Sequence, residues 1–171
     1  MRIIINDANI LIDLVQLDLM NEFIQLELDL KTTDFVYEEL NDEQKKVVAA
    51  FVESGDIEII VTAEDVDLNS IVSILTSSSG LSFEDCSVLH YASKLNGILL
   101  SGDGKLRKQA LANGITVCGI LFIFDQLLLN NLITFENAII RIQLLYDINP
   151  RLPGHSKDER ISRWILNQHV T

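Results

Sequence analysis

The 171-residue chain has few residues that could cross-link it or carry it through a membrane. Its only two cysteines, Cys86 and Cys118, are too few and too far apart for a disulfide framework or a four-cysteine zinc site. No apolar run is long enough to span a bilayer, and the opening MRIIIND lacks the apolar stretch of a signal peptide. We therefore expect a protein of a reducing, cytoplasmic compartment, with no membrane segment.

Basic residues are also scarce, and they are unevenly distributed. The net charge is −12, with 19 acidic and 4 basic side chains in residues 1–85 against 6 acidic and 9 basic ones in residues 86–171. Such an acidic chain is a poor candidate for a nonspecific nucleic-acid binder. The basic second half still leaves room for one face that contacts phosphate, whereas most acids of the first half are expected on a solvated surface.

Hydrophobic residues make up 48% of the chain, which predicts a packed globular protein. Short apolar or β-branched runs predict strands over residues 2–6, 31–36, 57–62, 98–101 and 115–119. Helical spacing predicts helices over residues 8–26, 37–55, 63–80, 81–97, 104–114, 120–131, 134–148 and about 157–168. This alternation indicates an α/β fold with a mostly parallel sheet, in which ligands bind at the carboxyl ends of the strands.

Four acidic residues are expected at that edge of the sheet. Asp7 follows the first strand, and Asp103 follows the fourth. Glu39 lies after the second strand in the first turn of a helix, and Asp85 opens the helix that leads into the fourth strand. Taken singly, each could be a helix cap, a turn residue or part of a solvated helix surface. Together they would repel one another, which favours a hard divalent cation with oxygen ligands.

Three segments carry a resemblance to a known family: IINDANILIDL, TTDFVYEEL and LSFEDCSVLHYASKLNGILLSGDGKLRKQALANGITVCG. Over residue 2 to about residue 135 the sequence resembles the PIN-domain family of metal-dependent ribonucleases, especially the small prokaryotic toxins of toxin–antitoxin pairs. The resemblance implies a three-layer α/β/α sandwich around a central, mostly parallel five-stranded sheet, with extra C-terminal helices. It divides the chain into a nuclease domain, residues 1–135, and a helical extension, residues 136–171, packed on the same domain.

The resemblance also implies which residues form the site. The acids that match the catalytic and metal-binding positions are Asp7, Glu39, Asp85 and Asp103. They would hold one or two Mg²⁺ or Mn²⁺ ions. Asn9 and Ser101 match the small polar positions beside the first and last acids, where they would orient carboxylates or waters. Glu38 competes with Glu39 for its position, and Glu84 competes less well with Asp85.

The activity that this resemblance implies is in-line hydrolysis of RNA phosphodiester bonds by an endoribonuclease. Asp7, Asp85 and Asp103 would hold the metal, and Glu39 would help to bind a metal or position the attacking water. The implied partners are an RNA substrate, a cognate antitoxin protein and a second copy of the chain in a homodimer. An alternative is a PIN-like module that is catalytically weak or inactive and acts through a protein partner.

Two basic groups are candidates for contacts with the RNA backbone. Lys105, Arg107 and Lys108 follow the last acid, and a solvated helix surface explains them equally well. The second group lies in the tail and consists of Arg151, Lys157, Arg160 and Arg163. It could be an RNA-binding edge or the polar face of the last helix.

A phosphotransfer enzyme of another doubly wound fold is a further possibility. Haloacid-dehalogenase-like phosphatases have two aspartates separated by one residue after the first strand, and here the second position is Asn9. A receiver-type phosphoacceptor would need an acid pair at the first strand, where Asn6 precedes Asp7. Both departures argue against phosphotransfer.

Overall fold

The computed structural model describes residues 2–149, 152 and 154–168, and five strands form its centre. These strands are β1 (Ile3–Asn6), β2 (Asp29–Thr33), β3 (Ile57–Ile60), β4 (Ile98–Leu100) and β5 (Val117–Cys118). Their order is β3-β2-β1-β4-β5, and all four pairings are parallel. The chain moves outward from β1 to β3 and then returns to β4 on the other side of β1. The switch point where ligands bind in such sheets therefore lies between β1 and β4.

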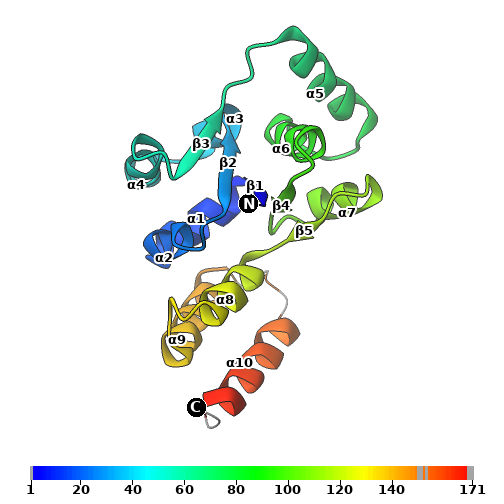
Figure 1. The fold of residues 1–171 in the computed structure, drawn as a ribbon. Coiled ribbons are helices and arrows are strands. Elements are labelled where there is room, and N and C mark those ends of the chain that lie inside the picture. Colours follow the sequence, from blue (N-terminus) through cyan, green and yellow to red (C-terminus); the bar gives the residue numbers. More distant parts are fainter. Residues whose placement is uncertain (1, 150–151, 153, 169–171) are drawn as a thin grey trace.

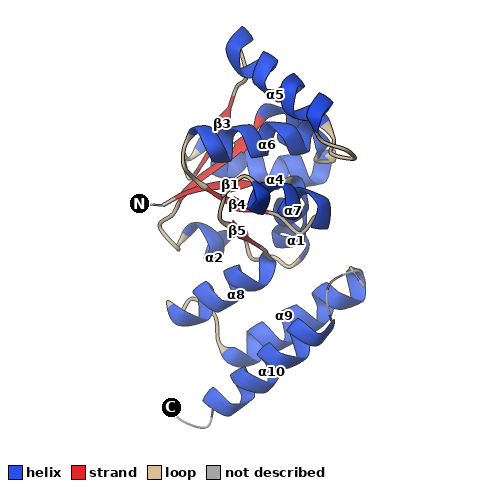
Figure 2. Ribbon diagram, turned by 90° about the vertical axis from the view of Figure 1, so that its right-hand side faces the viewer, coloured by secondary structure: helices blue, strands red, loops and turns tan. Residues whose placement is uncertain are grey.

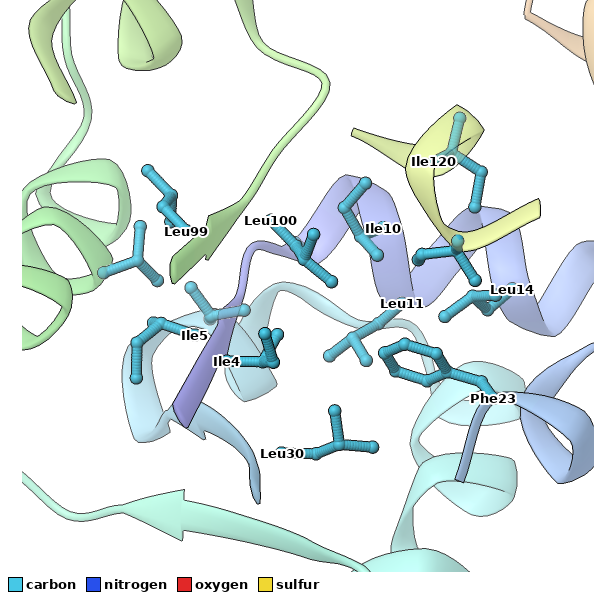
Figure 3. Packing of buried hydrophobic residues seen from close by; sticks show 14 of the residues in the cluster. Ile4, Ile5, Ile10, Leu11, Leu14, Phe23, Leu30, Leu99, Leu100 and Ile120 are labelled. Atoms are coloured by element: carbon cyan, nitrogen blue, oxygen red, sulfur yellow. The ribbon is translucent and has the colours of Figure 1, made fainter. Parts of the chain in front are cut away.

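Helices cover both faces of this sheet. Ile4 points toward helix α1 (Ala8–Gln16), whereas Ile5 and Leu99 point the opposite way (Figure 3). Helix α6 (Phe83–Lys94) contacts β1, β2 and β4 and covers that opposite face. Because strand side chains alternate between faces, both faces of a sheet this apolar must be covered. The expected α/β/α sandwich is confirmed.

The predicted helix over residues 8–26 is two helices in the structure. Helix α1 ends at Gln16, and α2 spans Met20–Ile24. Asp18 stands between them with a φ of 51°, in the left-handed region that no helix can continue through. The apolar spacing continues across the break because Leu14 and Phe23 are both buried in the same core. Periodicity alone therefore did not reveal this break.

The second strand and the helix after it also differ from the prediction. The strand ends at Thr33 rather than at residue 36, because the Thr33 hydroxyl caps helix α3 (Asp34–Glu39) by accepting from Val36 N at 3.2 Å. A second helix, α4 (Asp42–Glu53), follows instead of one helix over residues 37–55. Glu39 therefore ends α3 and does not lie in the first turn of a long helix.

The other helices agree well with the predicted positions. They are α5 (Asp65–Ser77), α7 (Gly104–Ala112), α8 (Ile120–Leu129), α9 (Phe135–Ile148) and α10 (Gly154–Gln168). Helices α8, α9 and α10 lie together at one end of the molecule, away from α5 (Figures 1 and 2). In the described residues, no helix has both the length and the apolar character that a membrane crossing needs.

Helix α10 is fixed on α8 by one aromatic contact and two ion pairs. Trp164 is only 2% exposed, and its ring centroid lies 6.0 Å from that of Phe124. Arg160 and Arg163 both pair with Asp125, at 3.0 and 3.1 Å. Trp164 therefore anchors the last helix. The division of the chain at residue 135 stays a prediction.

Candidate active site

The carboxyl ends of β1 and β4 bring the first and last predicted acids together. Asn6 and Leu100 are in register, and Asp7 N donates to Leu100 O at 3.0 Å. The Ser101 hydroxyl then donates to Asp7 Oδ2 at 2.6 Å and accepts from Asp103 N at 3.0 Å. Ser101 is fully buried, so one hydroxyl group links the two acids inside the protein.

Asn9 forms a second bridge between the two ends. Its Nδ2 donates to Asp7 Oδ2, and its Oδ1 accepts from Gly102 N at 2.7 Å. A Cβ atom on Gly102 would lie 3.1 Å from Asn9 Oδ1, so a side chain there would crowd this contact. Asn9 and Ser101 therefore both hold the Asp7 carboxylate and the turn that leads to Asp103.

Asp7 is the most buried of the four acids, with 4% of its surface exposed. Its Oδ1 accepts from Ala8 N at 2.8 Å, so it is also the cap of α1. The pKa of Asp7 is raised to about 6, mainly by burial and also by the negative charge of Asp85, although the hydrogen bonds from Ser101, Ala8 N and Asn9 act to lower it. The protein therefore keeps a carboxylate where its negative charge is poorly compensated.

Asp85 and Asp103 each use one carboxylate oxygen to cap a helix. Asp103 Oδ1 accepts from the first-turn amides of α7 at 2.8 and 2.9 Å, and Asp85 Oδ2 accepts from Ser82 N at 2.9 Å. The other oxygen of each accepts no hydrogen bond from the residues that the structure describes. Burial raises the pKa of Asp85, and the negative charge of Asp103 adds to this effect. One oxygen of each carboxylate is therefore used in helix capping, and the other oxygen is available to a ligand.

Glu39 approaches the same acids from the end of α3. The pKa of Glu39 is raised to about 7. The main cause is partial burial, and the negative charges of Glu84, Asp7 and Asp85 add to it. Its neighbour Glu38 instead pairs with Lys45 at 2.5 Å on the solvated surface. Glu39, and not Glu38, is therefore the glutamate on which the negative charges of the acidic cluster act. Glu84 contributes charge to this cluster from the first turn of α6.

The chemistry of these donors fits a hard divalent cation. In the described part of the chain, no three carboxylate, imidazole or thiol groups are arranged to hold one metal ion together. Magnesium, however, is commonly held by one or two protein carboxylates, several waters and the substrate phosphate. Oxygen donors with raised pKa values and unused lone pairs meet that requirement, and a cation would relieve their mutual repulsion.

The three basic residues of α7 lie at different distances from the acids. Arg107 Nη1 donates to the Ser101 carbonyl at 2.8 Å, so this guanidinium reaches the site. The Lys105 side chain lies beside the loop before α6, where a Cβ on Gly80 would be 2.9 Å from its Nζ. Lys108 is exposed. Of these three side chains, that of Arg107 is the one with a hydrogen bond to the predicted site in the part of the chain that the structure describes.

The basic tail residues are largely engaged elsewhere. Arg160 and Arg163 pair with Asp125, and Lys157 Nζ lies 5.0 Å from the centroid of the Tyr146 ring. Arg151 lies outside the described residues. The predicted RNA-binding edge on the tail is thus partly neutralised by an acid of α8.

Two groups of polar residues near the site were not predicted from the sequence. Ser87 and Thr33 are both fully buried, and their hydroxyl oxygens lie 2.7 Å apart, joining α6 to the end of β2. Asp13 lies on α1 four residues after Asn9 and is 7% exposed. The spacing of Asp13 from Asn9 could have indicated its place near the site, because residues i and i+4 share a helix face.

Comparison with known proteins agrees with this architecture. A family model described as a PIN domain matches residues 3–164. The crystal structure of PAE2754 from Pyrobaculum aerophilum is similar with a TM-score of 0.52, covering 72% of this chain and 95% of that chain at 15% sequence identity. At this identity the likeness shows the fold alone. A search of curated proteins found no match.

Proposed function

The chain belongs to the PIN-domain family, whose fold is of the nuclease type, and on this premise we propose that it is a Mg²⁺- or Mn²⁺-dependent endoribonuclease that hydrolyses RNA phosphodiester bonds. The observation that carries the proposal is the set of carboxylates at the switch point between β1 and β4. Asp7 is buried there without a pairing cation in the described residues, and its pKa is raised to about 6. Groups with perturbed pKa values that converge at a ligand-binding edge are typical of catalytic sites.

Three of the acids would hold the cation. Asp7, Asp85 and Asp103 each present carboxylate oxygen at the sheet edge, and the Ser101 and Asn9 hydrogen bonds keep Asp7 in position. When bound, a divalent cation supplies neutralisation of the phosphodiester charge and lowers the pKa of a coordinated water. The buried hydrogen bonds of Ser101 favour a single orientation of Asp7, which limits the reorganisation that the site needs.

Glu39 is suited to accept a proton from the attacking water. Its pKa of about 7 lies near the working pH, where a general base combines adequate basicity with a large deprotonated fraction. Its position at the end of α3 leaves it exposed, so a water molecule can reach it. Arg107, which contacts the Ser101 carbonyl, would bind a phosphate oxygen of the RNA backbone.

Cleavage of a defined single-stranded RNA with and without Mn²⁺ tests this proposal. The wild type should cut in Mn²⁺ and lose its activity in excess EDTA. Asp7→Asn and Asp103→Asn should be inactive, whereas Glu38→Gln removes a neighbouring charge outside the cluster and should remain active. Equal cleavage by wild type and Asp7→Asn would contradict the proposal, because a contaminating nuclease or another site would then be responsible.

A second candidate is a PIN-like module that acts through a protein partner. It is favoured by the lack of a preformed metal-holding group in the described residues and by the capping roles of Asp7, Asp85 and Asp103. Folded wild type that neither binds Mn²⁺ nor cleaves RNA would favour this candidate. The toxin role, a cognate antitoxin and a homodimer belong to the proposal only as predictions from family resemblance.

A further inference from the structure

A cavity of about 610 Å³ lies beside the proposed active site. Asn9, Ser101 and Asp103 form the part of its wall that it shares with the site. From there it extends between α1 and α10, where Ser156 of α10 lines it. Its volume is in the range of pockets that bind small molecules. A nucleotide whose phosphate lies at the acids could therefore place its base in this cavity.

Asp13 is the notable residue of the cavity wall. It is 7% exposed, and its carboxylate forms no hydrogen bond or ion pair with the residues that the structure describes. A buried carboxylate without donors is unfavourable, and burial raises the pKa of Asp13 to about 6. Asp13 lies one helical turn after Asn9 on the same face of α1, so it continues the polar edge of the active site into the cavity.

Neither of the two arginines that line the cavity pairs with Asp13. Arg160 pairs with Asp125 at 3.0 Å, and Arg107 donates to the Ser101 carbonyl at 2.8 Å. Since neither arginine pairs with Asp13, a phosphate group placed beside Asp13 would be repelled. The suitable occupant is uncharged and flat, and it donates hydrogen bonds to a carboxylate.

The remaining walls favour an aromatic ring. Leu121, Phe122 and Leu152 line the cavity and supply apolar surface for the faces of a base. Single-stranded RNA exposes its bases in this way, and proteins read them by stacking and by hydrogen bonds to the Watson–Crick edge. Guanine is the base whose Watson–Crick edge presents two adjacent N–H donors, at N1 and N2, which match the two oxygens of a carboxylate. The other three bases place an acceptor beside their donor.

We propose that this cavity is a subsite for one unpaired guanine of the RNA substrate, with Asp13 accepting hydrogen bonds from its Watson–Crick edge. This inference rests on the proposed ribonuclease function for its substrate class. Asp13 is here a specificity residue, because it contacts the base and not the reacting phosphate. Cleavage next to guanosine is the expected consequence.

NMR titration of the full ¹⁵N-labelled chain with GMP, AMP, CMP and UMP in EDTA tests the subsite without metal or cleavage. GMP should bind at least about tenfold more tightly than the other three, which is the discrimination expected of a good bidentate contact. The shifted amides should include those of Asp13 and Ser156. Equal binding of the four nucleotides, or no binding of GMP, would overturn the inference.

Three variants test whether the preference for GMP arises at Asp13 and in this cavity. Asp13→Asn keeps the shape but presents a donor in place of one acceptor, so the preference for GMP should fall by about tenfold or more. Asp18→Asn removes the same charge from an exposed position after α1 and should behave as wild type. Ser156→Trp fills the cavity from α10 and should weaken all four nucleotides. Retention of the GMP preference in Asp13→Asn would contradict the role of Asp13.

Cleavage of two RNAs that differ by a single guanosine separates this inference from the proposed function. Cutting of both RNAs at equal rates, in a metal-dependent manner, would overturn the guanine subsite and leave the ribonuclease proposal intact. Selective GMP binding without any RNA cleavage would overturn the ribonuclease proposal and support a guanine-nucleotide site. Preferential cutting beside the guanosine, lost in Asp13→Asn, would support both.

Discussion

Asp7 and Asp67 are buried to nearly the same degree, with 4% and 6% of their surfaces exposed, and their surroundings are opposite in charge. Asp67 on α5 contacts Lys94 Nζ at 2.7 and 2.8 Å and His90 Nε2 at 2.7 Å. Hydrogen bonds from Lys94 and then His90 hold the pKa of Asp67 below its usual value. Asp7 instead has a hydroxyl, an amide and a backbone N–H as partners, and its pKa is raised by burial and by Asp85.

The difference separates a structural acid from a candidate ligand-binding one. Asp67, with Lys94 and His90 of α6 as its partners, joins α5 to the rest of the fold and is complete without a ligand. Asp7 is oriented as firmly as Asp67, but its charge remains uncompensated among other acids. Burial of a carboxylate is thus uninformative by itself, whereas the sign of its pKa shift shows whether the protein already supplies the counter-charge.

The largest expected effect is on activity. Asp7→Asn or Asp103→Asn should lower the rate of Mn²⁺-dependent RNA cleavage by at least about 100-fold, because each removes a charge that the metal would need. Asp67→Asn should leave the rate per folded molecule unchanged. The rates are measured on one RNA at saturating Mn²⁺. An equal loss in Asp67→Asn would show that activity merely follows fold integrity.

The next effect is on stability, where we expect the Asp67 variant to lose more than the Asp7 variant. Asp67→Asn should lower the Tm by several degrees because it leaves Lys94 and His90 without their acid. Asp7→Asn should keep or raise the Tm, since it removes a self-repelling buried charge. Thermal unfolding followed by circular dichroism measures both, with the exposed Asp65→Asn of the same helix as control. A Tm loss in Asp7→Asn larger than that in Asp67→Asn would contradict the comparison.

The two aspartates should also differ in how stability depends on pH. The folded pKa of Asp7, about 6, lies above its ordinary value, so its contribution becomes less favourable as pH rises from about 4 through 6. The folded pKa of Asp67 is lowered, so its contribution is present above about pH 4 and is lost as pH falls through the folded value.

Urea unfolding at pH 4.5 and pH 8 measures this difference. The gain in unfolding free energy from Asp7→Asn should be larger at pH 8 than at pH 4.5 by about 2 kcal/mol, because part of the full pKa difference already acts at pH 4.5. The loss from Asp67→Asn should stay nearly constant between these pH values. A pH-independent effect of Asp7→Asn would show that Asp7 is not protonated in the folded state at pH 4.5.

The smallest effect on activity concerns Glu39. Glu39→Gln should slow cleavage by about 100-fold, the lower end of the effect of a general base, and flatten the rise of the rate with pH, because Glu39 would be the group that must lose its proton. Glu38→Gln, one residue earlier and paired with Lys45, should keep both the rate and the pH profile. If the pH profile of Glu39→Gln equals that of wild type, Glu39 is not the base.

Much of the arrangement was predictable because the determining interactions are local. Apolar strands alternating with helices indicated the five-stranded sheet, and Asp85 is one of the helix caps that the sequence allowed, since it forms a capping box with Ser82. The predicted position of Glu39 was wrong because Thr33 caps α3 and therefore ends β2 early. The partners of Asp67 were not predictable, since Lys94 lies 27 residues away and no local pattern marks the contact. Asp13 was missed because its environment arises only when α10 packs near α1.

Binding of Mn²⁺ to folded wild type, Asp7→Asn and Asp67→Asn, measured by isothermal titration calorimetry, tests the central claim most directly. The claim is that Asp7 is part of an uncompensated acidic site and Asp67 is not. Wild type and Asp67→Asn should bind Mn²⁺ saturably and with similar affinity, and Asp7→Asn should lose that binding. Equal binding by all three proteins, or no binding by wild type at millimolar Mn²⁺, would contradict the claim.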